Sequence, residues 1–243
     1  MIVWGPGSVS SAHTHHCFQL VLSLRGALRI RGDRGRMWIQ CGAALVKPDA
    51  RHEVDAKDTL ALIAFVEPES ELGAALAERL AHSITPIAAS DVNRWRGQLG
   101  DPASLTAARV EPWVRQELLG GRKPAKVHPG VRRVLRFLRE QIGNSGAWSL
   151  ETLEEVSGLS RWRLMHVFRE STGVPLRPYI LWLRLQRASG ELVRGASATE
   201  AAHTAGFADA AHMTRTFRRM LGTTPSELAS RRQNVGGAFV ESA

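Results

Sequence analysis

A short module occurs twice in the C-terminal half of the chain, and this repeat limits the folds open to that half. The run RLMHVFRESTG starts at Arg163, and the run HMTRTFRRMLG starts at His212. Aligning Phe168 with Phe217 gives an offset of 49 residues, the difference between those two numbers. At that offset a capping residue, an arginine and a glycine recur, as Ser160 and Asp209, Arg169 and Arg218, and Gly173 and Gly222. Because Ser and Asp favour helix N-caps and Gly favours the position after a helix, each copy predicts one short helix.

Each copy forms the second helix of a predicted helix-turn-helix unit. The preceding runs, residues 149–158 and 197–207, are short helical stretches that begin with serine and stop near a glycine. A long amphipathic run, residues 175–195, joins the two units. Roughly 17 to 20 helical residues span about 25 to 30 Å, close to the ~34 Å between successive major-groove faces of B-DNA. Two such helices could enter adjacent grooves and add their binding free energies.

The charge distribution favours a nucleic-acid partner for this half. The chain has a formal net charge of +9. Residues 127–243 hold 16 arginines, no lysine and 10 acidic residues, a net of +6, whereas residues 1–126 contribute +3. An arginine excess suits a phosphate backbone, although basic faces are often merely solvated. A helical repeat that binds protein is the alternative, because the recurring apolar positions indicate only that each helix packs on a core.

The N-terminal half has the texture of an antiparallel β domain with helices. Apolar or alternating runs in residues 17–24, 26–32, 36–46 and 59–66 are separated by Gly, Asp and Pro, and helical patterns follow in residues 69–84 and 104–119. A stretch rich in Gly, Pro and Lys then predicts a linker. We therefore expect a domain at residues 1–119, a linker at 120–130 and a helical domain at 131–235. One apolar stripe either closes the first domain's core or forms a dimer seam; it comprises Val110, Trp113, Val114 and Leu118.

Other sequence features bear on location and redox chemistry. The longest strongly apolar run, residues 60–66, is far too short to cross a bilayer, and the first ten residues lack the pattern of a signal peptide. We expect a cytoplasmic protein without a membrane partner. Cys17 and Cys41 do not make a disulfide framework. We interpret them as buried thiols, with oxidant sensing as the alternative.

The C-terminal half resembles the DNA-binding domain of the AraC/XylS family of bacterial transcription regulators. The resemblance rests on LSRWRLMHVFRESTGVPLRPYILWLRLQRA and AAHTAGFADAAHMTRTFRRMLGTTPSEL, which cover most of residues 127–231. In the second run Gly206, Phe207, Gly222 and Pro225 fall in the family's order and spacing. The resemblance implies a two-unit reader of double-stranded promoter DNA that also engages RNA polymerase. It further implies an N-terminal domain that senses a small-molecule effector, and it favours a homodimer.

The resemblance also assigns the residues that read DNA. They are Arg161, Trp162, Arg163, Met165, His166 and Arg169 in the first unit, and Ala211, His212, Arg215, Arg218 and Arg219 in the second. Arg215 is the strongest candidate for a base contact, because its guanidinium can bond to guanine O6 and N7 together. Met165 and Ala211 offer only apolar contacts, for example to thymine methyl groups. The arginines near the helix ends suit phosphates, and His166 has a solvated side chain as its alternative interpretation.

In this family the sensing domain is often a cupin, and the N-terminal half looks similar. The matching positions are Gly7, His13, His15, Gln19 and Gly26, followed by Gly42, Pro48 and His52. In metal-binding cupins such positions supply three histidines and a glutamate to one Zn, Ni, Fe or Mn ion. The resemblance therefore makes His13, His15, Gln19 and His52 a candidate metal site, with Gln19 in place of the acidic ligand. The other interpretation is an apolar cupin pocket for a small organic effector.

Together these patterns predict an α+β multidomain protein. We expect an N-terminal antiparallel cupin-like β barrel with packed helices, and a C-terminal all-α domain of two helix-turn-helix units joined by a long helix. The predicted function is sequence-specific transcription regulation rather than enzymatic catalysis. A metal-dependent cupin enzyme with a helical accessory domain is the alternative, and an architectural DNA-binding protein without an effector is a third possibility.

Overall fold

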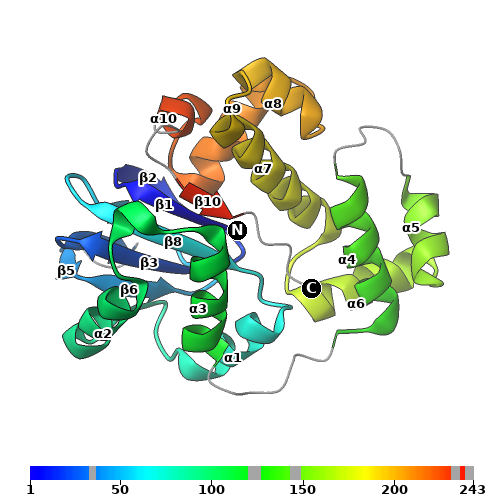
Figure 1. Ribbon diagram of the computed structural model, residues 1–243. Helices are drawn as coiled ribbons and strands as arrows, with labels where there is room; N and C mark the ends of the chain where they lie inside the picture. Colours follow the sequence, from blue (N-terminus) through cyan, green and yellow to red (C-terminus); the bar gives the residue numbers. More distant parts are fainter. Residues whose placement is uncertain (33–36, 120–126, 143–148, 231–235, 239–243) are drawn as a thin grey trace.

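The structure is a computed structural model that describes residues 1–32, 37–119, 127–142, 149–230 and 236–238. Its N-terminal half contains two antiparallel sheets with helices beside them, and its C-terminal half is helical (Figure 1). The first sheet has the strand order β10-β1-β8-β3-β6-β9 and the second has β2-β7-β4-β5. The strands are β1 (Ile2–Pro6), β2 (Val9–His13), β3 (Phe18–Arg25), β4 (Leu28–Gly32), β5 (Ile39–Cys41), β6 (Ala43–Val46), β7 (His52–Asp55), β8 (Leu60–Val66), β9 (Ile84–Pro86) and β10 (Gly236–Ala238).

The two sheets pack as an open sandwich, so the expected closed barrel is wrong in this respect. Apolar side chains from both sheets share one core, which includes Val21, Leu28, Ile30, Val46 and Val54. In the described residues β2 and β5 form the edges of the second sheet, and neither pairs with a strand of the first. Without those pairings the hydrogen-bond network does not close into a barrel.

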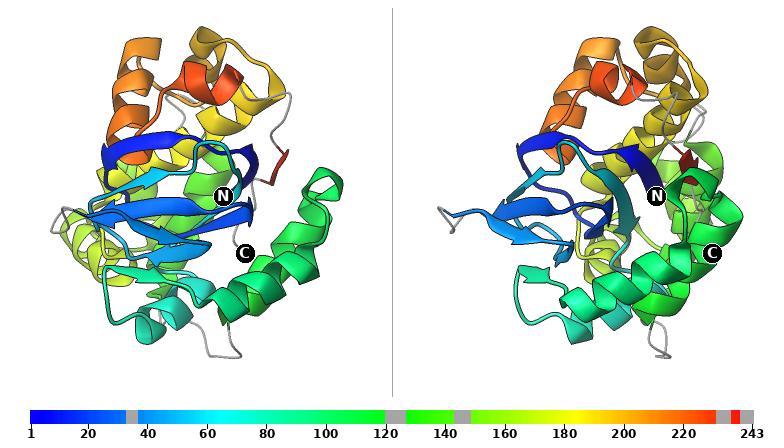
Figure 2. Two further views of the ribbon diagram at one scale, coloured as in Figure 1. Left: turned by 90° about the vertical axis from the view of Figure 1, so that its left-hand side faces the viewer. Right: turned by 60° about the vertical axis from the view of Figure 1, so that its left-hand side comes forward.

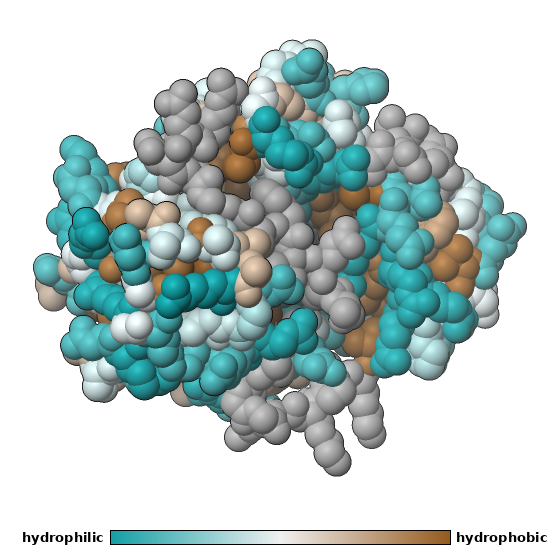
Figure 3. Space-filling model, viewed as in Figure 1, coloured by the Kyte–Doolittle hydropathy of each residue, from teal (hydrophilic) through white to brown (hydrophobic). Residues whose placement is uncertain are grey.

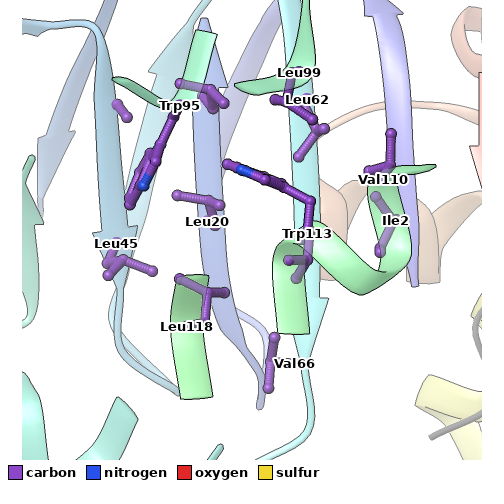
Figure 4. Close-up of a cluster of buried hydrophobic side chains, with 14 of the residues drawn as sticks. Ile2, Leu20, Leu45, Leu62, Val66, Trp95, Leu99, Val110, Trp113 and Leu118 are labelled. Atoms are coloured by element: carbon purple, nitrogen blue, oxygen red, sulfur yellow. The ribbon is translucent and has the colours of Figure 1, made fainter. Parts of the chain in front are cut away.

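Helices cover the outer face of the six-stranded sheet. They are α1 (Glu71–Arg79), α2 (Ala89–Leu99), the 3-10 helix η1 (Pro102–Ser104) and α3 (Ala107–Leu119). Trp113 and Leu118 of α3 pack on Leu20 and Leu62 of the sheet, and Trp95 of α2 meets Trp113 edge to face (Figure 4). All four residues of the predicted apolar stripe on α3 are buried here. The stripe therefore closes this domain's own core and is not free to form a dimer seam.

The C-terminal half contains seven helices in the described residues. They are α4 (Pro129–Gln141), α5 (Leu150–Ser157), α6 (Arg161–Thr172), α7 (Leu176–Arg194), α8 (Ala198–Thr204), α9 (Ala210–Leu221) and α10 (Pro225–Ser230). The pairs α5–α6 and α8–α9 are the two predicted helix-turn-helix units. Ser149 and Ser197 make capping boxes, and the Asp209 side chain accepts a hydrogen bond from the His212 amide. Ser160 occupies the N-cap of α6 but makes no side-chain cap.

The two halves pack directly against each other. Trp182 of α7 contacts Phe65 and His15 of the sandwich, and Cys17 belongs to the same buried cluster. Figure 2 shows α9, in orange, beside the blue strand β2. In Figure 3 apolar side chains show mainly in recesses between the halves and among the C-terminal helices. The predicted linker falls largely on residues 120–126, outside the described residues. No helix in the described part is long and apolar enough to cross a membrane.

Candidate nucleic-acid interface and ligand cavity

One face of α6 is packed and the other is open to solvent. Leu164, Val167 and Phe168 are buried in the core of the first unit. The predicted contact residues lie on the other side: Arg161, Trp162, Arg163, His166 and Arg169 are exposed and Met165 is half-buried. Trp162 is 74% exposed, which is unusual for so large an apolar side chain, and its ring stacks on His166 at 5.6 Å. This face is therefore free for a partner.

The second helix, α9, repeats this division. Met213, Thr216 and Phe217 are buried, whereas the side chains at Ala211, Arg215, Arg218 and Arg219 are exposed. His212 differs from the others, because its ring lies edge-on against Phe207 at 5.3 Å and is half-buried. Neither candidate face is buried against the other helix.

Most arginines of these two faces are available to an anion. Arg161 is the exception, since it pairs with Glu151 at 2.7 Å and lies 3.8 Å from Glu154. Such exposed ion pairs stabilise by only about 0–1 kcal/mol, so a phosphate can displace them. None of the other five arginines makes a side-chain hydrogen bond or ion pair with a described residue; they are Arg163, Arg169, Arg215, Arg218 and Arg219. Among them Arg219 lies apart, in a groove at the joint between the halves.

A single rod separates the two helices. Helix α7 has 19 residues and links α6 to α8, so that α6 and α9 lie toward its opposite ends (Figure 1). At ~1.5 Å per residue α7 is about 28 Å long. Its apolar side chains are shared between the two units, with Leu176 and Ile180 in the first core and Leu185 and Leu192 in the second. The rod is thereby fixed to both units.

Residues 11–16, which we call the clamp segment, bind both units at equivalent places. In the second unit the Ser11 amide donates to Gly222 O at 2.9 Å, and the Thr14 amide donates to Arg219 O at 3.4 Å. In the first unit His16 Nε2 donates to Thr172 O at 2.8 Å and its ring lies against Gly173. Gly173 and Gly222 are the paired glycines of the sequence repeat.

Close approach at these glycines depends on their lack of a side chain. Gly222 has a φ of 65°, and a Cβ atom there would lie 2.3 Å from Ser11 O and 2.6 Å from His13 Nδ1.

His16 of the clamp segment also bonds to Asp49 Oδ2 at 2.8 Å. Although burial opposes it, these two acceptors raise the pKa of His16 and favour its charged form. No sequence pattern indicated these long-range contacts.

A cavity of about 130 Å³ lies between the sandwich and the second unit. Its wall is mainly apolar and includes Trp4, Ile63, Phe65, Leu221 and Leu228, with His13, Gln19 and Ser189 as polar members. A cavity of ~150 Å³ in an engineered protein accommodates benzene, so this one can take a small apolar group. Because Leu221 belongs to α9 and Leu228 to α10, such a group would touch the second unit directly.

The structure brings together the four predicted metal-site residues. His13, His15 and His52 are all buried, and one ring nitrogen of each lies within 4.8 Å of the others. Gln19 Oε1 is 2.9 Å from His15 Nε2 and 2.7 Å from His52 Nε2. Burial and the neighbouring His52 lower the pKa of His13 to about 4 and that of His15 to about 3, so both rings are neutral at pH 7.

Two buried acids also lie at the joint, and sequence reasoning missed them. Glu67 Oε1 accepts a hydrogen bond from Gln186 Nε2 of α7 at 3.1 Å. Burial opposes ionisation of Glu67, but the Met1 ammonium group and Arg139 lower its pKa overall. For Glu69, burial and the neighbouring Glu67 raise the pKa to about 7. Arg139 Nη2 is 3.8 Å from Glu69 Oε1.

The thiols show no sign of activation. Cys17 is buried and Cys41 is half-buried, and the two are not bonded to each other. Burial raises the pKa of both thiols, which keeps them protonated and weakly nucleophilic. This supports the interpretation as inert thiols.

Comparison with known proteins identifies the helical half. A family model described as a helix-turn-helix domain matches residues 153–231. The chain is 30% identical over 98 residues to the probable transcription factor PqrA of Proteus vulgaris, covering 40% of this chain and 80% of that protein. It is 27% identical over 137 residues to the Msm operon regulatory protein of Streptococcus mutans, covering 56% of this chain. That match spans 48% of the length of the streptococcal protein.

A solved structure shares the whole fold. The crystal structure of ToxT from Vibrio cholerae O395 aligns with a TM-score of 0.55 and covers 95% of this chain and 97% of its own. The sequence identity is 11%, so this likeness concerns the fold alone. It extends the similarity from the helical half to the arrangement of a two-sheet N-terminal domain before a helical one.

Proposed function

Because the chain belongs to the AraC/XylS family of transcription regulators, we propose that it reads promoter DNA with α6 and α9 and adjusts this reading when a small molecule binds at its N-terminal domain. The chain is a DNA-binding regulator and not an enzyme. The names of its relatives, a transcription factor and an operon regulatory protein, agree with this assignment. The observation that carries the proposal is the pair of helices with packed inner faces and arginine-bearing outer faces, held by one 19-residue rod.

The exposed side chains divide into two roles. Arg215 is placed on the open face of α9 without a described partner, so we assign it a bidentate contact to guanine. On α6 the rings of Trp162 and His166 stack on each other, and His166 occupies the position that Arg215 has in the repeat on α9. We assign base contacts to both rings. The remaining arginines are assigned to phosphates, which add affinity and salt dependence but carry no sequence information.

The effector is inferred from the cavity. Its apolar wall and small volume favour an apolar molecule or chain, and His13 and Gln19 offer hydrogen bonds to a polar end. One ToxT structure is described as bound to an unsaturated fatty acid, which fits this class of ligand. A ligand that touches both Phe65 of the sandwich and Leu221 of α9 loses some of these contacts when the two parts separate. Its binding therefore shifts the equilibrium between the possible arrangements of the two parts.

The family also suggests partners beyond DNA. We propose that the DNA-bound protein contacts RNA polymerase, and that it acts in the cytoplasm, where promoter DNA lies. A homodimer would need a surface other than the α3 stripe, because that stripe is buried within the chain.

The test compares two arginines of α9. Arg215→Ala should weaken binding to a selected DNA duplex by about 1–3 kcal/mol and relax the preference at one base pair. Arg218→Ala should weaken binding about equally for all sequences and reduce the slope of log affinity against log salt by about 1. Fluorescence anisotropy on a panel of single-base variants measures both. An unchanged sequence profile for Arg215→Ala would remove that residue from the reading role.

A further inference from the structure

Two buried acids of the sandwich face the helical half at the joint. Glu67 and Glu69 directly follow strand β8, and each is only 6% exposed. Glu67 Oε1 accepts a hydrogen bond from Gln186 Nε2 of α7 at 3.1 Å. Both carboxyl oxygens of Glu69, in contrast, are buried without a hydrogen-bond partner among the described residues. Glu69 therefore lacks the hydrogen bonds that would stabilise a negative charge in a buried position.

The groups around Glu69 compensate a negative charge only in part. Arg139 Nη2 of α4 lies 3.8 Å from Glu69 Oε1 and 3.4 Å from the hydroxyl oxygen of Tyr179 on α7. The same guanidinium group also acts on Glu67, so one positive charge faces two acids. The other titratable groups near the acids are His16, which is paired with Asp49, the Cys17 thiol and, beside Glu67, the Met1 ammonium group.

This environment favours the neutral form of Glu69 while the halves are packed together. Burial and the neighbouring Glu67 oppose ionisation, and they raise the pKa of Glu69 to about 7. If the halves separate, water reaches the carboxylate and this cost disappears. The proton of Glu69 is therefore held more tightly when the joint is closed than when it is open.

We propose that Glu69, together with Glu67, is a proton-dependent latch between the two halves. While the Glu69 carboxyl group is protonated, the halves stay packed through Trp182, Phe65 and the other buried side chains of the joint. Loss of the proton to solvent leaves a buried charge beside Glu67 and favours an arrangement in which the halves have moved apart. Relative movement is the ordinary expectation for two domains that meet at a partly polar interface.

The size of the effect follows from two pKa values. The pKa of Glu69 is about 7 in the closed joint, and we take the ordinary value of 4.5 for the open one. The ratio of open to closed molecules should therefore rise about 10-fold between pH 6 and pH 8. At still higher pH the total increase approaches about 300-fold, which is the ratio of the two acid constants.

The latch acts on the elements that hold the reading helices, and this step rests on the proposed function. Arg139 belongs to α4, which packs on α5 and α6, and Gln186 belongs to α7, which joins the two units. When the halves move apart, the clamp segment also loses its hydrogen bonds to Gly222 O and Thr172 O. Helices α6 and α9 are then held by α7 alone. Loss of the Glu69 proton should therefore change the affinity for DNA.

Alkylation of Cys17 measures the opening of the joint without DNA. Cys17 is 1% exposed and shares a buried cluster with Phe65 and Trp182, so N-ethylmaleimide reaches it only after this region opens. The full-length wild type and Glu69→Gln are treated at pH 6 and pH 8, and mass spectrometry quantifies the modified Cys17 peptide. The ratio of the two rates cancels the pH dependence of the thiol and of the reagent. This ratio should rise about 10-fold from pH 6 to pH 8.

Three controls identify the motion and the group responsible for it. Glu71→Gln, at an exposed position of α1, should show the same rates as the wild type at both pH values. Low concentrations of urea should accelerate Cys17 alkylation less steeply than they promote complete unfolding, because less surface becomes exposed. Glu67→Gln removes the like charge beside Glu69 and should move the midpoint of the rise to lower pH.

Two results would overturn the latch. One is a ratio of wild-type to Glu69→Gln rates that stays constant between pH 6 and pH 8. The other is a urea dependence of Cys17 alkylation equal to that of complete unfolding, since the thiol would then be exposed by unfolding of the whole protein.

DNA binding tests the latch separately from the proposed function. The ratio of the wild-type and Glu69→Gln affinities for a selected duplex should change at least about 5-fold between pH 6 and pH 8, a typical size for coupling between sites. Alkylation that depends on pH with a constant affinity ratio would overturn the effect on DNA and leave the latch standing. Absence of DNA binding in every variant would overturn the proposed function, whereas the alkylation result would be unaffected.

Discussion

Replacing Glu69 with glutamine should remove a loss of folding stability that occurs as the pH rises. Glu69 lies at the joint between the two halves. The carboxyl group is buried beside Glu67, and its neighbours Tyr179 and Arg139 offset the cost of ionising it only in part. Its folded-state pKa of about 7 lies above the ordinary value of 4.5. The folded protein therefore binds this proton more tightly than the unfolded chain. The contribution of Glu69 to the free energy of unfolding is accordingly largest below about pH 4.5 and falls as the pH rises to about 7.

The size of the effect follows from the same two values. A difference between about 7 and 4.5 corresponds to about 3 kcal/mol at ~1.4 kcal/mol for each unit of pKa. Glutamine carries no titrating proton, so the stability of Glu69→Gln relative to the wild type should increase by about 3 kcal/mol between about pH 4.5 and about pH 8. Any packing difference that does not depend on pH cancels in this comparison.

Urea unfolding followed by circular dichroism at the two pH values measures this difference. Glu71→Gln, two residues further along the chain and exposed on α1, serves as the control and should show the same pH dependence as the wild type. A Glu69→Gln protein whose relative stability does not change with pH would refute the assignment of a raised pKa to Glu69. The buried carboxyl would then have the same pKa in the folded protein as in the unfolded chain.

Three further predictions concern packing and the DNA-facing surface. Gly222→Ala should lower the melting temperature, because a Cβ atom would lie 2.3 Å from Ser11 O at a positive φ, whereas Gly97→Ala, with open space around it in α2, should not lower it. Trp113→Ala should cost about 3–5 kcal/mol of unfolding free energy in a denaturant titration, since the ring is buried against the six-stranded sheet. Trp162→Ala should weaken DNA binding measurably while leaving the melting temperature unchanged, because the ring is 74% exposed; a large loss of stability would indicate a structural role instead.

Local signals made the helical half readable from sequence. Ser149, Ser197 and Asp209 act within three residues of their own position, and Gly158 and Gly222 end helices through backbone conformations that they adopt readily. These features need no distant partner. The predicted order of two helix-turn-helix units joined by a long helix is confirmed for that reason, as is the α+β architecture.

Features that depend on distant residues were not predictable. Strand β7, HEVD, has no apolar run and becomes a strand by pairing with β2 and β4. Helix α2 buries only Val92, Trp95 and Leu99, so its pattern is weak. Strand β10 follows the helical half and pairs with β1, more than 230 residues earlier. The open sandwich, the clamp segment and the buried acids at the joint likewise depend on how two separately patterned halves meet.

The histidine cluster has one property that could be predicted from sequence and others that could not. The spacing of His13, His15 and His52 indicated convergence, and the structure places all three together with Gln19. Their neutrality and the contacts of the clamp segment with Gly222 and Thr172 could not be inferred from spacing, because they follow from burial and from packing against helices more than 150 residues away.

Selection of duplexes from a random pool by the full-length protein tests the central claim most directly. If α6 and α9 read DNA together, the selected sequences should contain two conserved blocks whose centres lie about 10 base pairs apart, one helical turn. Trp162→Ala should degrade one block and Arg215→Ala the other. A single conserved block that only one of these variants affects, or no enriched sequence at all, would contradict reading by two helices held on one rod.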